Sequence, residues 1–173
     1  MPVDTCFQVE ELLVSVRRVA DALERALIPY QVVGSFAVFL HTEPIEPGTA
    51  HITRKVEIAI DERCLDRLAA ALREAGFGFQ DIGDGTISVP DEAGGCIKIH
   101  TCAWAESTVP VRAMRGLFVI PAGGLIHTML NRYRLEDRLL LQDLDHARII
   151  TPEIEASLSA PLRTRLAEVR ATE

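Results

Sequence analysis

The chain has 173 residues, of which 48% are hydrophobic and 25% are charged, and its formal net charge is −7. This length allows one domain with a substantial core and is too short for two full domains. The acidic balance argues against a general nucleic-acid binder, which normally presents a basic face, but it is compatible with a local basic pocket.

Nothing in the chain indicates a membrane span or export. No segment approaches the roughly 20 apolar residues of a membrane-spanning helix, and the first residues lack the charged start and apolar run of a signal peptide. The four cysteines form no CxxC pair, so we expect reduced thiols in a cytoplasmic protein. They are Cys6, Cys64, Cys96 and Cys102.

The first half of the chain predicts a long helix followed by strands that alternate with helices. Apolar residues recur at helical spacing over residues 7–27, and Pro29 ends this amphipathic helix. The expected elements that follow are a strand at 30–33, a short helix at 36–41, a loop at 42–50, a strand at 52–60 and a helix at 62–75. Apolar and polar side chains alternate in the second strand, so Lys55 and Glu57 share one face.

The second half predicts further strands and then helices only. The strands are expected at 77–80, 86–89, 96–101 and 117–120, and the helices at 122–133, 135–148 and 160–170, with a helix start at Thr151-Pro152-Glu153. The pattern indicates an α/β (α+β) fold, in which a mixed sheet is flanked by helices. We expect an α/β domain at 1–120, which includes the first helix, and a C-terminal helical extension at 121–173 packed on it.

Two segments carry a resemblance to a known family. Val-Val-Gly-Ser-Phe-Ala-Val at 32–38, followed after a loop by Thr-Arg-Lys-Val-Glu-Ile-Ala-Ile at 53–60, resembles the nucleotidyltransferase superfamily that includes DNA polymerase β. The chain is most similar to small bacterial nucleotidyltransferase-like proteins, some of which are toxin components. A helix that ends at Gly76-Phe77, and Gly124-Leu125-Ile126 before an arginine-rich helix, extend the resemblance over about 26–144.

The resemblance implies a site that holds phosphates and metal ions. In that family a strand ends in Gly-Gly or Gly-Ser, a later strand carries two Asp one residue apart, and a neighbouring strand carries a third acid. Backbone N–H groups at the turn, here Gly34 and Ser35, can hold the phosphates of a nucleotide. Two acids at i and i+2 point the same way and can bind one Mg²⁺, and the third acid helps to hold a second metal ion.

The chain departs from this pattern at the acids. Lys55 and Glu57 stand at the two Asp positions, and Lys98 and His100 are the candidates for the position of the third acid. The two lysines are the only ones in the chain, and together with Glu57 they leave a net charge of +1, which repels Mg²⁺. The tail also has Leu-Leu-Leu-Gln-Asp at 139–143, where family members often have Lys-Asp-x-x-Asp. We therefore expect neither a cofactor nor the two-metal reaction, and Glu57 is the remaining catalytic candidate.

Two interpretations of Lys55, Glu57 and Lys98 stay open. They can form a surface salt-bridge ladder across neighbouring strands, which contributes little to stability. Alternatively, the lysines take over the role of the metal as cations, and with Gly34 and Ser35 they bind a nucleotide or another phosphate ligand without Mg²⁺.

His100, Arg132 and Arg134 are secondary candidates for ligand binding. His100 shares a strand face with Cys96 and Cys102, but one strand spreads the three side chains too far apart for a tetrahedral zinc ion, so we expect no metal site. The arginines lie in the densest basic stretch of the chain. They can pair with acids on the same helices, or they can bind the phosphates of a nucleotide or of an RNA end.

Three functions are compatible with these residues. The favoured one is a catalytically degenerate nucleotidyltransferase-fold protein that binds a nucleotide, another phosphate ligand or a protein partner through the former active-site cleft. The alternative is an active enzyme that transfers a nucleoside monophosphate from NTP-Mg²⁺ to RNA, protein or a small molecule, with Asp61 or Asp84 assisting Glu57. The third is a non-catalytic partner of the toxin–antitoxin type. The apolar start of the first helix would also suit a homodimer contact.

Overall fold

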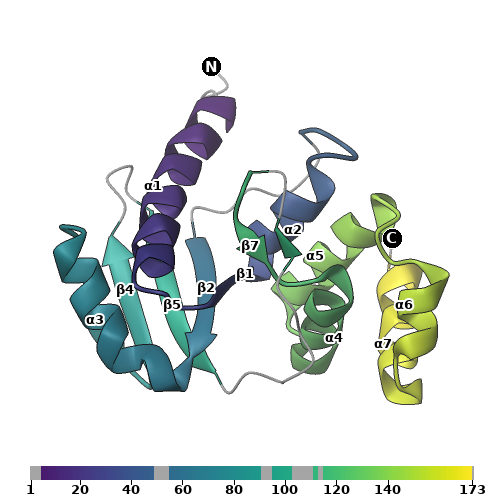
Figure 1. Cartoon of the computed structure of the whole chain (residues 1–173). Helices are drawn as coiled ribbons and strands as arrows, with labels where there is room; N and C mark the ends of the chain where they lie inside the picture. Colours follow the sequence, from purple (N-terminus) through teal and green to yellow (C-terminus); the bar gives the residue numbers. More distant parts are fainter. Residues whose placement is uncertain (1–4, 49–54, 91–94, 103–110, 113–114, 173) are drawn as a thin grey trace.

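In the computed structural model, which describes residues 5–48, 55–90, 95–102, 111–112 and 115–172, seven strands form one mixed sheet flanked by helices (Figure 1). The strands are β1 (Tyr30–Val33), β2 (Lys55–Asp61), β3 (Gln80–Gly83), β4 (Thr86–Pro90), β5 (Cys96–Cys102), β6 (Val111–Arg112) and β7 (Phe118–Val119). The helices are α1 (Thr5–Arg25), α2 (Gly34–Thr42), the 3₁₀ helix η1 (Glu62–Cys64), α3 (Leu65–Glu74), α4 (Ala122–Arg132), α5 (Leu135–His146), α6 (Pro152–Ser157) and α7 (Ala160–Ala171).

The strand order β3-β4-β5-β2-β1-β7-β6 places β2 at the centre of the sheet. β2 is parallel to β5 and antiparallel to β1, and β1 is parallel to β7. In the β2–β5 pair, Glu57 is opposite Lys98 and Ala59 is opposite His100. Residues that are opposite each other in a sheet point to the same face. This register therefore brings Glu57, Lys98 and His100 to one face of the sheet.

The two faces of β2 differ because its side chains alternate. Val56, Ile58 and Ile60 are fully buried. α1 and α3 pack against each other and cross this face of the sheet (Figure 1). Lys55 and Glu57 point to the opposite face, where each is only partly buried. The apolar half of the strand therefore builds the core, and the polar half is available for a site.

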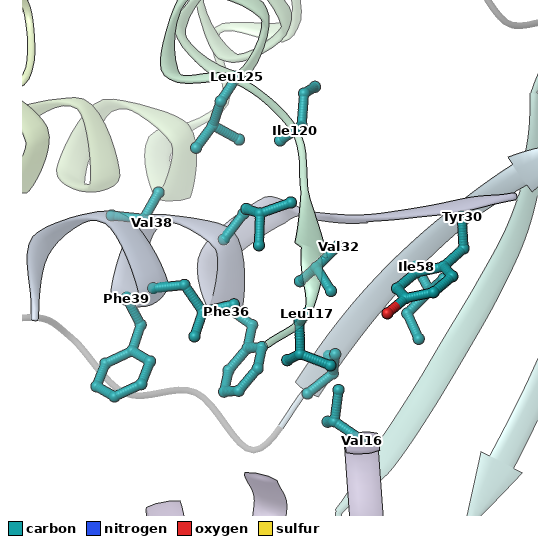
Figure 2. Packing of buried hydrophobic residues seen from close by; sticks show 14 of the residues in the cluster. Val16, Tyr30, Val32, Phe36, Val38, Phe39, Ile58, Leu117, Ile120 and Leu125 are labelled. Atoms are coloured by element: carbon teal, nitrogen blue, oxygen red, sulfur yellow. The ribbon is translucent and has the colours of Figure 1, made fainter. Parts of the chain in front are cut away.

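α2 connects the sheet to the C-terminal helices. It packs against α4 and α5, and both of these pack against α7. Phe36 and Phe39 of α2 are stacked with 5.7 Å between ring centroids, and they lie in the buried cluster that Figure 2 shows. His41 Nε2 near the end of α2 is 2.8 Å from the Ile120 carbonyl oxygen, which fixes this helix beside the end of β7. The buried hydrophobic cluster contains residues of every part of the chain from α1 to α7. The division into domains at 120/121 stays a prediction.

The predicted fold class is confirmed, and most elements lie within a few residues of the expected positions. The strand predicted at 77–80 is wrong, because β3 begins at Gln80. Gly76 has a φ of +80°, and the Phe77 N–H donates to the Leu72 carbonyl, so residues 76–77 close helix α3 instead of starting a strand. The two-residue strand β6 was not predicted. In the described part of the chain, every helix is too short or too polar to cross a membrane.

Candidate functional site

The site begins at the turn where β1 passes into α2. Gly34 is the first residue of this nine-residue helix and has a φ of +68°, a conformation that glycine adopts without the strain other residues incur. Val33, which precedes the helix, does not cap it with its side chain. The Gly34–Ser35 turn expected from the sequence is therefore present at the start of a helix.

Glu57 of β2 reaches this turn. A methyl group on Gly34 would overlap Glu57 Oε2, so the carboxylate lies against the first residue of α2. The other carboxylate oxygen, Oε1, is 2.9 Å from Lys55 Nζ. The Glu57 side chain is 17% exposed and that of Lys55 is 44% exposed, so the pair lies at the rim of the site with its acid inside. The alternation of β2 predicts that these two side chains are neighbours, and the structure places them in an ion pair.

His100 of β5 is the third group around this carboxylate. Its Nε2 atom is 3.5 Å from Glu57 Oε1, and its Nδ1 atom is 3.0 Å from Thr86 Oγ1. Among the described residues, Nε2 is buried and has no closer polar partner. Ala59 is opposite His100 in the register, so Glu57, two residues earlier on the same face of β2, is a diagonal neighbour of His100. His100 is thus held between a hydroxyl group and a carboxylate.

These contacts keep Glu57 ionised. The pKa of Glu57 is lowered to about 2, most strongly by hydrogen bonding with His100; burial opposes the shift, and Lys55 adds to it. At 3.5 Å the His100 contact is at the limit of a hydrogen bond, whereas the Lys55 contact at 2.9 Å lies well within it. Both neighbours lower the pKa of Glu57. Glu57 is therefore an anion at neutral pH.

Lys98 is the second cation of the site. It is opposite Glu57 on one side and opposite Ser88 of β4 on the other, and its side chain is half-buried. Within the described ranges, the Lys98 side chain makes no hydrogen bond or ion pair. Lys98, which the sequence places near the position of the third acid, therefore lies beside the Lys55–Glu57 pair. Its ammonium group has no carboxylate partner among the described residues.

The two further acids considered for the enzyme alternative do not join Glu57. Asp61 is four residues further along β2, about 13 Å away at the usual rise of a strand. Its carboxylate accepts from the Arg63 backbone and side chain at 2.7–2.8 Å, and these bonds lower its pKa to about 2. Asp84 is exposed in the turn between β3 and β4, with a φ of +52°. Among the described residues, no group of three His, Cys, Asp or Glu side chains could hold a metal ion.

The arginines predicted as secondary candidates are engaged at the junction of α4 and α5. Arg132 Nη2 lies 2.5 Å from the fully buried carboxylate of Asp137, which also accepts from the Arg134 backbone N–H at 3.2 Å. Arg134 is 3.8 Å from Glu136. These pairs are the helix pairing that the sequence allowed as one of two interpretations. Whether the arginines also bind a ligand stays a prediction.

The start of β1, at the far end of this strand from Gly34, lines a cavity. This cavity of about 360 Å³ lies between Leu27, Tyr30 and Phe118, whereas Gly34 follows the end of β1. The candidate site lies on the polar face of β2 and β5. Sequence reasoning did not find the Thr86 contact of His100 or the position of the Glu57 carboxylate over Gly34, because both depend on the register of strands far apart in the chain.

The chain matches one protein-family model over more than half of its length. The family model described as aminoglycoside-2''-adenylyltransferase matches residues 15–134, which include the turn, β2 and β5. No curated protein sequence matches the chain.

Solved structures with a similar fold include three nucleotidyltransferase-type proteins. The crystal structure of ANT(2'')-Ia in complex with adenylyl-2''-tobramycin has a TM-score of 0.58 and 10% identity, over 92% of this chain and 97% of that chain. The lincosamide antibiotic adenylyltransferase LnuA, bound to lincomycin, has a TM-score of 0.53 and 14% identity over 79% and 95%. An antigenic nucleotidyltransferase-like protein from Paracoccidioides brasiliensis has a TM-score of 0.64 and 15% identity over 95% and 89%. At these identities the likeness establishes a nucleotidyltransferase fold.

Proposed function

We propose, for a chain that belongs to the aminoglycoside-2''-adenylyltransferase family, that the polar face of β2 and β5 binds the phosphates of a nucleotide without a metal ion. Lys55 and Lys98 would supply the positive charge, and Gly34 and Ser35 would supply backbone N–H groups. The observation that carries the proposal is Lys98, a half-buried cation beside Glu57 that has no ion pair in the described part of the chain.

The charge of the site supports binding over metal-dependent transfer. Two Mg²⁺ ions need several converging carboxylates, and Glu57 is the only candidate carboxylate that the described residues bring to the Gly34 turn. Lys55 and Lys98 stand on the same face as Glu57, so a divalent cation there would meet two like charges. A phosphate group would meet two opposite charges at the same place.

Titration with ATP in the presence of EDTA tests the proposal. We expect wild-type protein to bind ATP without a divalent metal ion. Lys98→Met, which keeps an aliphatic side chain and removes the charge, should weaken binding by roughly tenfold. Arg25→Gln removes the same charge from α1, which covers the opposite face of the sheet, and should leave the affinity unchanged. Binding only when Mg²⁺ is present, or equal binding by all three proteins, would contradict the proposal.

Active nucleotide transfer is the second candidate, and the family match favours it. The similar structures named above include two adenylyltransferase-type proteins bound to adenylyl-2''-tobramycin and to lincomycin. Incubation of the chain with Mg²⁺-ATP and tobramycin or lincomycin, followed by mass spectrometry, tests for an adenylylated product. A product that is formed by wild type and lost in Glu57→Gln would favour the enzyme. A protein partner, a homodimer and a toxin–antitoxin role stay predictions.

A further inference from the structure

The anion position of the candidate site already contains an anion, the Glu57 carboxylate. One oxygen lies against Gly34 at the start of α2, and the other is 2.9 Å from Lys55 Nζ and 3.5 Å from His100 Nε2. Lys55 and His100 are groups that a phosphate oxygen would use, and Gly34 begins the helix whose first N–H groups can bind a phosphate. The carboxylate therefore takes the place that a bound phosphate would take, and it comes from the protein itself.

The backbone of Glu57 is fixed in the sheet, whereas its carboxylate is held in place by the side chains around it. Glu57 lies on a central strand, so its backbone is fixed by β1 on one side and β5 on the other. Its side chain has rotatable bonds between this backbone and the carboxylate, so the carboxylate can leave the turn by a change of rotamer without movement of the sheet. The absence of a Cβ on Gly34 provides the space that the carboxylate occupies.

We propose that Glu57 is a built-in competitor, and that a phosphate-bearing ligand binds by displacing its carboxylate from the Gly34 turn and by taking Lys55 and His100 as partners. This inference rests on the proposed function, because it concerns the same site. Lys98, which is beside Glu57 and has no ion pair among the described residues, would receive the ligand first.

To displace the Glu57 carboxylate, a ligand needs more negative charge than the carboxylate carries. A carboxylate carries one negative charge, whereas a phosphate monoester or a polyphosphate carries close to two or more and offers more acceptor oxygens. A singly charged ligand gains no electrostatic advantage over the internal carboxylate, whereas a doubly charged phosphate does. The site therefore selects multiply charged phosphates and rejects simple carboxylates.

The test compares wild type with Glu57→Gln and Glu57→Ala, each titrated with ATP and with acetate in the presence of EDTA. Glu62→Gln is the matched control, because it removes one negative charge from the exposed side chain that follows the other end of β2. We expect both Glu57 variants to bind ATP roughly tenfold more tightly than wild type or more, and to gain acetate binding. Glu62→Gln should bind as wild type does. Circular dichroism and thermal unfolding establish that each variant is folded.

The outcomes separate this inference from the proposed function. If wild type binds ATP and both Glu57 variants bind it equally or more weakly, the competitor role is overturned while the proposed function stands. If only the Glu57 variants bind ATP, the carboxylate blocks the site and is not displaced by the ligand, so both the displacement and the proposed function of the wild-type protein are overturned. If none of the proteins binds ATP, both the proposed function and the inference are overturned. If Glu57→Ala does not fold, Glu57→Asp replaces it. The shorter Asp side chain keeps the charge but withdraws from Gly34, so this variant should also bind ATP more tightly than wild type.

Discussion

Glu57 and Gly34 share a contact that leaves no room for a side chain at position 34. Gly34 has a φ of +68°, and a methyl group on it would overlap Glu57 Oε2. Two independent physical reasons thus require glycine at the start of α2. The contact joins the turn that can hold a phosphate to the carboxylate that occupies it.

Gly34→Ala should lower the free energy of unfolding, both because of the positive φ and because of the overlap with Glu57. The left-handed conformation costs roughly 1–2 kcal/mol for alanine, and the overlap with Glu57 adds about 1–3 kcal/mol. Gly76→Ala is the control, since Gly76 has a φ of +80° and open space around it. Urea unfolding gives the loss of unfolding free energy in each variant. The additional loss in Gly34→Ala over Gly76→Ala measures the overlap with Glu57. Repeating the pair in a Glu57→Ala background should remove that difference, and a difference that persists would contradict the contact.

The contribution of Glu57 to stability should depend on pH. Its pKa falls from 4.5 to about 2 on folding, mainly through His100 and with a further contribution from Lys55, which corresponds to about 3 kcal/mol. Because the folded pKa is the lower one, this stabilisation is fully present above about pH 5 and is lost as the pH falls toward 2.

The measurement is the difference in unfolding free energy between wild type and Glu57→Gln at pH 6, 4.5 and 3. We expect the difference to shrink steadily with the pH. Asp61 also has a pKa lowered to about 2, but it is present in both proteins and cancels from the difference. A difference that stays constant over this range would show that Glu57 is not held as an anion by its neighbours.

The two lysines should differ in their reactivity toward an acylating reagent. The Lys55 ammonium group is held 2.9 Å from Glu57, whereas Lys98 has no ion pair within the described residues. Because the Lys55 pair must open before its amine reacts, Lys98 should be acylated several-fold faster. Peptide mass spectrometry after brief acetylation reads both sites, since the chain has no other lysine. In Glu57→Gln the two rates should approach each other, and ATP should protect both lysines in wild type.

Asp137 should be essential for the junction of α4 and α5. Its carboxylate is fully buried and paired with Arg132 at 2.5 Å. Arg132→Ala should lower the free energy of unfolding by about 3–5 kcal/mol, because it leaves a buried charge without its partner. Glu136→Gln breaks only the exposed 3.8 Å contact with Arg134 and should cost less than about 1 kcal/mol. Thermal unfolding ranks the two variants, and equal midpoints would contradict the structural role of Asp137.

The sequence predicts those parts of the site that depend on one strand or one turn. Alternation along β2 is sufficient to place Lys55 and Glu57 on the same face. The Gly34–Ser35 pair between a strand and an apolar helix is sufficient to locate the turn. Both are local patterns, and the structure contains both.

The parts of the site that depend on distant segments could not be predicted. His100 reaches Glu57 only because β5 pairs with β2 in a register that places His100 opposite Ala59. No local pattern determines that register. Similarly, the aromatic residues Phe77 and Phe79 favour a strand by composition, but Gly76 turns the chain back on α3, and the two rings lie under Arg18 and Arg73. Tertiary packing outweighs the local preference there.

The separation of the two faces of β2 has a consequence for how this scaffold can change over evolutionary time. The buried residues Val56, Ile58 and Ile60 hold the strand in the core, while Lys55 and Glu57 alternate with them and contribute to the site. Single substitutions on the polar face can therefore exchange an acid for a base without altering the backbone beneath it. A lineage could move between metal-dependent chemistry and metal-free binding, in either direction, by a few codon changes on one inherited framework.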